Sequence, residues 1–122
     1  DAICATKAAI KEGIVPGGGV ALLNAALKME EENEGERVLG KAIISPYKTI
    51  LDNAGIEKIT IPAKNGDGIN VVTGNMVNMI KAGIIDPLLV TKSALKNAAS
   101  VATTILSTDC VINNLRIDEG SR

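Results

Sequence analysis

The sequence has no histidine, tryptophan or phenylalanine, and its one tyrosine is Tyr47. Without histidine, a Ser/His/Asp or Cys/His nucleophilic site is excluded, because both need an imidazole as general base. The two cysteines, Cys4 and Cys110, cannot complete a tetrahedral zinc site without further Cys or His ligands. A single aromatic ring offers no platform for stacking single-stranded bases. These absences exclude several classes of enzyme and nucleic-acid binder.

The sequence also lacks an excess of charge of one sign and lacks long apolar runs. The chain carries 13 basic and 14 acidic side chains, for a net charge of −1, so no general attraction to a phosphate backbone is expected. No apolar run approaches the ~20 residues that a membrane-spanning helix needs. Two cysteines are too few for a small secreted disulfide scaffold. We expect an intracellular, reduced protein with neither nucleic-acid nor membrane partners.

The 122 residues are rich in Ile and Ala and are of one-domain length. Hydrophobic spacing and Gly/Pro punctuation predict a mainly α fold, an antiparallel helical bundle with a few short β strands. Helices are expected over residues 1–12, 20–29, 38–44, 47–53 and 87–108. A solvated acidic turn is expected over 30–36, a helical turn over 77–81, and strands over 59–61, 69–72, 84–85 and 110–115. The chain lacks an initiator Met and starts within a helical pattern, which suggests a fragment or a processed product.

Residues 17–19 form a triple glycine that leads into a helical pattern. Such a turn can bring backbone N–H groups close to a phosphate or a sugar. It matches neither a Walker A loop nor a dinucleotide fingerprint. A tight helix–helix connection also explains the glycines, and the spacing alone favours that structural interpretation over a ligand site.

Three polar residues have both a structural and a functional interpretation. Asp86, before a proline, is typical of a helix N-cap, and its second carboxylate oxygen could accept hydrogen bonds from ribose hydroxyls. Asn70 follows a Gly-rich turn and could either end a strand or bind a base through its amide. Asp1 could cap the first helix or orient an attacking water.

The order of the motifs carries more information than any single motif. Residues 5–22 read Ala-Thr-Lys-Ala-Ala-Ile-Lys-Glu-Gly-Ile-Val-Pro-Gly-Gly-Gly-Val-Ala-Leu, and residues 83–87 read Gly-Ile-Ile-Asp-Pro, followed at 90–95 by Val-Thr-Lys-Ser-Ala-Leu. Both stretches closely resemble group I (GroEL-like) chaperonins, in that family's order and over essentially the whole chain. The resemblance implies that residues 1–12 end an intermediate-domain helix. Residues 13–122 then form the C-terminal half of an equatorial, ATP-binding domain.

The resemblance implies roles for three residues near the ends of these motifs. Asp1 matches the catalytic aspartate at the hinge of the intermediate domain, which polarises the water that attacks ATP. Ile84 matches an apolar contact to the base. Asp86 matches the aspartate that holds the ribose hydroxyls.

Further ATP-binding positions are implied at the glycine turn and in the middle of the chain. Gly17 and Gly18 match glycines that pack against the nucleotide. Asn70, Val71 and Val72 match an Asn-Ala-Ala stretch that contacts the adenosine. The two valines replace small alanines, so we expect a narrower adenine pocket.

The implied cofactor is ATP, with Mg²⁺ held by residues that this chain lacks, and no metal ligand is expected here. Lys48 and Glu57 resemble positions that meet across two stacked rings. The segment from Cys110 to Asn113 resembles an edge strand that joins a neighbouring subunit. The phosphate loop, a second catalytic aspartate and the apical domain, which binds unfolded proteins and the co-chaperonin, are missing. Residues 57–70 are shorter than in typical members.

The leading hypothesis is a fragment of a chaperonin whose whole chain couples ATP hydrolysis to protein folding, with the isolated fragment inactive. The compartment would be the bacterial cytoplasm, or the matrix or stroma of an organelle. One alternative is a stand-alone interaction or oligomerisation module without ATPase activity, because half a domain would expose apolar surface. Another is an unrelated small nucleotide-binding protein.

Overall fold

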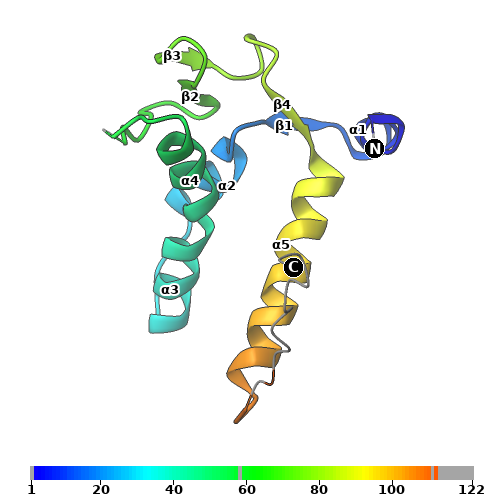
Figure 1. Cartoon of the computed structure of the whole chain (residues 1–122), viewed down its shortest axis with the longest axis vertical. Coiled ribbons are helices and arrows are strands. Elements are labelled where there is room, and N and C mark those ends of the chain that lie inside the picture. Colours follow the sequence, from blue (N-terminus) through cyan, green and yellow to red (C-terminus); the bar gives the residue numbers. More distant parts are fainter. Residues whose placement is uncertain (1, 58, 111, 113–122) are drawn as a thin grey trace, which may run out of the picture. The chain divides into compact units, whose positions relative to one another are not determined.

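The computed structural model describes residues 2–57, 59–110 and 112, and divides the chain into two compact units, residues 1–91 and 92–122. Helices make up most of the regular structure, which confirms the predicted mainly α fold (Figure 1). In chain order the elements are α1 (Ala2–Glu12), β1 (Ile14–Pro16), α2 (Val20–Leu27), α3 (Glu34–Ile43), α4 (Ser45–Asn53), β2 (Asp67–Asn70), β3 (Asn75–Asn78), β4 (Ile85–Pro87) and α5 (Leu88–Leu106).

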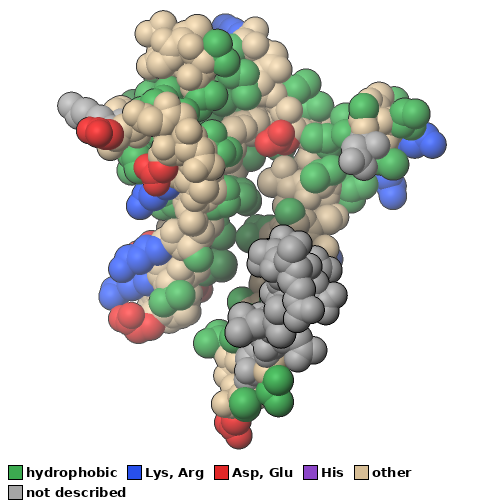
Figure 2. Space-filling view, viewed as in Figure 1, with side chains coloured by type: hydrophobic (Ala, Val, Ile, Leu, Met, Phe, Trp, Pro, Cys, Tyr) green, Lys and Arg blue, Asp and Glu red, His purple; other side chains and the backbone are tan. Residues whose placement is uncertain are grey.

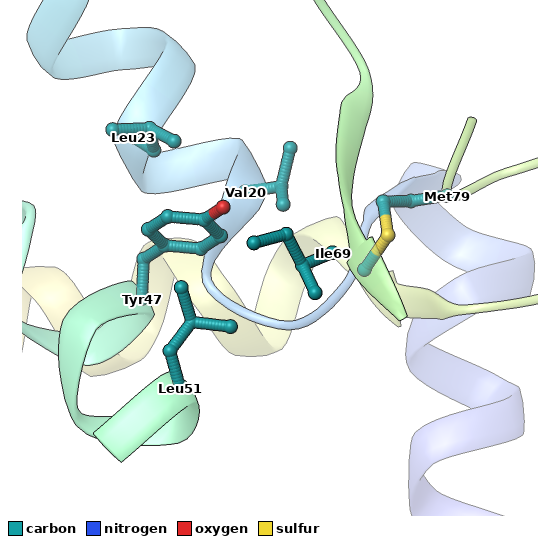
Figure 3. Packing of buried hydrophobic residues seen from close by; sticks show 6 residues of the cluster. All are labelled: Val20, Leu23, Tyr47, Leu51, Ile69 and Met79. Atoms are coloured by element: carbon teal, nitrogen blue, oxygen red, sulfur yellow. The ribbon is translucent and has the colours of Figure 1, made fainter. Parts of the chain in front are cut away.

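The core of the first unit lies where α2 and α4 meet the β2–β3 hairpin. Six buried side chains form it (Figure 3): Val20, Leu23, Tyr47, Leu51, Ile69 and Met79. Helix α3 packs beside α2 and α4 but contributes none of these six side chains. Because these side chains come from α2, α4, β2 and the turn after β3, the core fixes the α2 N-terminus relative to the hairpin.

Tyr47 is buried within this core, and its hydroxyl donates a hydrogen bond to the Thr60 carbonyl at 3.1 Å. Burial raises the pKa of Tyr47 above its ordinary value of 10.0, because a phenolate is poorly solvated there. The neutral side chain therefore contributes stability that is complete below about pH 10 and is lost as pH rises through the folded pKa.

We expect the absorbance of tyrosinate, which this single tyrosine reports without interference, to rise at a higher pH in the folded chain than in urea. The free energy of unfolding should fall over the same alkaline range. Tyr47→Phe should remove that dependence and cost about 1 kcal/mol at neutral pH, from the lost hydrogen bond. Identical titrations of the folded and unfolded chains would contradict this expectation.

Helix α3 begins earlier than the sequence predicts. Asn33 Oδ1 accepts a hydrogen bond from the Glu36 N–H at 3.0 Å, and Glu36 Oε2 accepts one from the Asn33 N–H at 3.2 Å. This reciprocal capping box starts the helix at Glu34, so the expected acidic turn over 30–36 is wrong in its second half. Glu34 and Glu36 lie in the first turn of α3, and Lys41 lies in its last turn.

The strands form two separate antiparallel pairs, β1 with β4 and β2 with β3. The expected strand over 59–61 is wrong, because those residues are irregular. The expected strand over 69–72 lies two residues earlier, as β2, and residues 71–74 turn into β3. The expected helical turn over 77–81 is wrong at its start, because β3 continues through Asn78 and the turn follows it.

The start of α5 also differs from the prediction. Val15 of β1 pairs with Asp86, which holds both Asp86 and Pro87 in extended strand β4. The helix begins at Leu88, whose N–H donates to the Gly13 carbonyl at 3.0 Å. Asp86 is therefore a strand residue and not the N-cap of α5, which leaves its carboxylate for another role.

The remainder of α5 carries the predicted stripe of mostly small apolar residues, and the helix buries no residue within the part that the structure describes. No described helix is long and apolar enough to cross a membrane. Cys110 is exposed and irregular, as is Ile112. The other residues of the expected strand over 110–115 lie outside the described residues, and so does Asn113.

Candidate functional site

The triple glycine connects β1 to α2 and lies against the start of β4. The Gly17 N–H donates to the Ile84 carbonyl at 2.9 Å. A Cβ added at Gly17 would lie 3.1 Å from both the Ile84 carbonyl carbon and the Ile85 nitrogen. A side chain here would be tighter than most Cβ contacts, so glycine favours this approach of two backbones. Residues far apart in the sequence, Gly17 and Ile84, are therefore neighbours.

The two following glycines need a backbone that other residues rarely adopt. Gly18 and Gly19 have φ values of 65° and 77°, in the left-handed region. A Cβ at Gly19 would lie 2.7 Å from the Tyr47 nitrogen, and one at Gly18 would lie 3.0 Å from Met79 Cε. The turn is thus held between α4 on one side and the residue after β3 on the other.

Asp86 lies on the opposite strand of the β1–β4 pair, half-buried. It lines a mostly apolar pocket of about 220 Å³ formed by α1, β1 and β4, together with Ala5, Thr6, Ala9, Ile14, Ile85 and Pro87. Within the part of the chain that the structure describes, no group donates a hydrogen bond to its carboxylate. A half-buried carboxylate beside a glycine turn is suited to accept hydrogen bonds from ligand hydroxyls.

Asn70 ends β2 and organises the turn that follows. Its Oδ1 accepts the Val72 N–H at 3.0 Å, and its carbonyl accepts the Gly74 N–H at 2.7 Å. The side-chain oxygen is thus engaged in an Asx turn, and the amide NH₂ keeps two donors for other partners.

Two variants test whether the Asn70 side-chain oxygen stabilises the turn. Asn70→Asp keeps an oxygen that can accept the Val72 N–H, so we expect its free energy of unfolding to stay within about 0.5 kcal/mol of the original chain. Asn70→Ala loses the Asx turn and should cost about 1 kcal/mol. Equal losses in both variants, measured by urea unfolding, would show that the side-chain oxygen does not stabilise the turn.

Val71 and Val72 lie on the turn between β2 and β3, and their side chains are 42% and 89% exposed. Neither valine lines the described pocket beside Asp86. The structure therefore brings Gly17, Gly18 and Ile84 together with the strand that carries Asp86, and places Asn70 and the two valines on a separate hairpin.

The remaining predicted positions lie on the surface or outside the described residues. Lys48 on α4 and Glu57 after it are both exposed. Asp1 lies outside the described residues. Among the residues that the structure describes, no three His, Cys, Asp or Glu side chains are grouped to hold a metal ion.

Sequence reasoning missed Met79, which contacts the glycine turn. Met79 lies in the turn after β3, where no helical or strand periodicity marks a residue as buried. The available signal was only its residue type, because the flexible, unbranched side chain of methionine is suited to fill an irregular space in a core.

Comparison with known proteins matches residues 1–116 to the TCP-1/cpn60 chaperonin family. The chain belongs to this chaperonin family. Its residues are 41% identical to the mitochondrial chaperonin homolog Hsp-60 of Caenorhabditis elegans, over 98% of this chain and 23% of that protein. The resemblance of the two motif stretches to chaperonins is thereby confirmed.

The fold agrees with this assignment. A group III chaperonin, whose crystal structure is in the open state, superposes with a TM-score of 0.72 and 26% identity, over 86% of this chain and 25% of that one. The chain thus spans about a quarter of the length of these relatives.

Proposed function

We propose that this chain is the C-terminal part of an ATP-dependent chaperonin subunit and supplies the adenosine side of its nucleotide site. Residues 1–12 would end the intermediate domain, and residues 13–122 would complete half of the equatorial domain. The observation that supports this most is the half-buried Asp86 carboxylate on the strand that Gly17 contacts, in a chain of the chaperonin family.

Each residue would have a distinct task in holding ATP. Gly17 and Gly18 let the backbone approach the nucleotide, since neither carries a Cβ. Ile84 offers an apolar surface to the base, and Asp86 accepts hydrogen bonds from the ribose hydroxyls. Asn70, with Val71 and Val72, contacts the adenosine from the hairpin.

Hydrolysis would need groups beyond these. Asp1 would polarise the attacking water as a general base. It precedes α1, and so would reach the site when the hinge closes. Mg²⁺, held by residues outside this chain, would neutralise charge on the phosphates when bound. Because the chain lacks a phosphate loop, we expect no measurable ATPase activity from the isolated chain.

The test is ATP binding by the complete subunit that contains this chain, measured by calorimetry. Asp86→Ala should raise the Kd for ATP about tenfold or more, because a hydrogen bond to a charged group contributes about 1.5–3 kcal/mol. Asp52→Ala is the matched control, since it removes an exposed carboxylate from α4. Equal Kd values for the original subunit and Asp86→Ala would contradict the proposed site.

The assembled protein would be a ring-forming chaperonin with itself as its main partner. Lys48 and Glu57 are exposed, as contacts between stacked rings would require, and residues from Cys110 to Asn113 would pair with a neighbouring subunit. Unfolded proteins and a co-chaperonin would bind the apical domain of the complete chain. The nematode relative is mitochondrial, which favours an organelle matrix, and the bacterial cytoplasm is the second candidate compartment.

A second candidate function is an interaction or oligomerisation module. Large apolar side chains are exposed on several described elements (Figure 2), among them Ile3, Ile10, Val38, Val101 and Leu106. Such surface favours association. Static light scattering of the purified chain distinguishes the two, because a stable monomer at high concentration argues against the module.

A further inference from the structure

Met79 is the side chain that joins the glycine turn to the rest of the candidate site. Only 2% of its surface is exposed. Its Cε lies 3.0 Å from the position that a Cβ would occupy at Gly18. Its Sδ lies 3.1 Å from the corresponding position at Gly68 in β2. One thioether therefore lies against both the glycine turn and the hairpin.

The backbone of Met79 makes two further connections. Its N–H donates to the Gly66 carbonyl at 2.9 Å, next to the start of β2. Its carbonyl accepts the Ile84 N–H at 2.8 Å, and the Ile84 carbonyl in turn accepts the Gly17 N–H at 2.9 Å. A closed loop of contacts thus runs from the glycine turn through Ile84 and Met79 back to Gly18.

We propose that Met79 is a positioning residue that sets the distance between the Gly17–Gly18 turn, Ile84 and the Asn70 hairpin, so that all three face one nucleoside. This inference rests on the proposed function. A flexible, unbranched thioether can fill the irregular space between two glycines that a branched side chain cannot reach. Shortening it would let the turn shift, and small displacements of binding groups weaken positioning strongly.

The first experiment compares variants of the complete subunit by steady-state ATPase kinetics. Met79→Val removes the atom that reaches Gly18 and should raise KM for ATP roughly tenfold while kcat at saturating ATP stays within about twofold. Met79→Leu keeps a similar volume but is branched and lacks an atom at the Met79 Cε position, so it should raise KM by an intermediate amount. Leu51→Val is the control, because Leu51 is equally buried in the same cluster. An unchanged KM in Met79→Val, or an equal rise in Leu51→Val, would overturn the inference.

The second experiment observes ligand binding by the unaltered subunit and uses a variant only to assign the resonance. With ¹³C-methyl-labelled methionine in the unaltered subunit, and Met79 assigned by its loss in Met79→Leu, ADP should shift the Met79 methyl resonance. Inorganic tripolyphosphate should leave it unmoved. A resonance that ignores ADP would contradict the positioning role. If Asp86→Ala weakens ATP binding but both Met79 results fail, only this inference is lost; if Asp86→Ala has no effect, the proposed function itself is wrong.

Discussion

Gly19→Ala is expected to destabilise the fold by about 3 kcal/mol or more. The new Cβ would lie 2.7 Å from the Tyr47 nitrogen and 2.8 Å from the Tyr47 Cα, which are backbone atoms of α4 and cannot rotate away. The left-handed backbone, with φ of 77°, adds about 1 kcal/mol of strain for any residue with a Cβ. Overpacking of this kind typically costs about 1–3 kcal/mol in addition.

Urea unfolding, monitored through the fluorescence of Tyr47 in the affected core, measures this loss of folding free energy. Gly55→Ala is the matched control, because Gly55 has a similar φ of 73° but no atom within 4 Å of the added Cβ. It should therefore show the backbone strain alone. If Gly19→Ala were no more destabilising than Gly55→Ala, the close contact between the glycine turn and α4 would be disproved.

Asp1→Ala in the complete subunit is expected to slow ATP hydrolysis about 10²- to 10⁴-fold, the usual contribution of a general base. The Kd for ATP should stay within about twofold, because Asp1 would act on the attacking water and not on the adenosine. Asp86→Ala should behave in the opposite way, with weaker binding and a kcat at saturation close to the original value.

Single-turnover hydrolysis together with equilibrium binding separates the two effects. Loss of binding in Asp1→Ala would place this residue among the nucleotide contacts. Hydrolysis at the original rate would remove it from the mechanism altogether.

Local signals in the sequence predicted those elements that local chemistry determines. Gly13, whose N–H bonds to the Ala9 carbonyl, ends α1 as expected, and Gly55 ends α4. The capping box at Asn33 was available in the sequence as an Asn followed three residues later by Glu36, and was overlooked among the glutamates. Its recognition would have placed the start of α3 correctly.

Errors arose where pairing across the chain overrides local preference. Asp86-Pro87 is a strong helix-start signal, yet pairing with β1 holds both residues in a strand. Residues 59–61 alternate like a strand, but in the described structure no strand pairs with them, and the Thr60 carbonyl instead accepts the Tyr47 hydroxyl. A strand needs a partner that its own sequence does not reveal.

The candidate site likewise has parts that the sequence predicted and parts that only the structure shows. Glycine spacing indicated a close backbone approach at residues 17–19, but only the structure shows that Ile84 is what approaches. The assignment of the glycines, Ile84 and Asp86 to one nucleotide came from family resemblance, because spacing alone also allowed a simple helix connection. The contacts of Met79 had no signal in the sequence beyond its residue type.

The most direct measurement of the central claim is a comparison of ATP with 2′,3′-dideoxy-ATP, bound to the original complete subunit and to Asp86→Ala. If Asp86 holds the ribose hydroxyls, the original subunit should bind the dideoxy analogue about tenfold more weakly than ATP. Asp86→Ala should bind the two nucleotides equally. An original subunit that does not distinguish them, or an Asp86→Ala variant that still prefers ATP tenfold, would contradict the account.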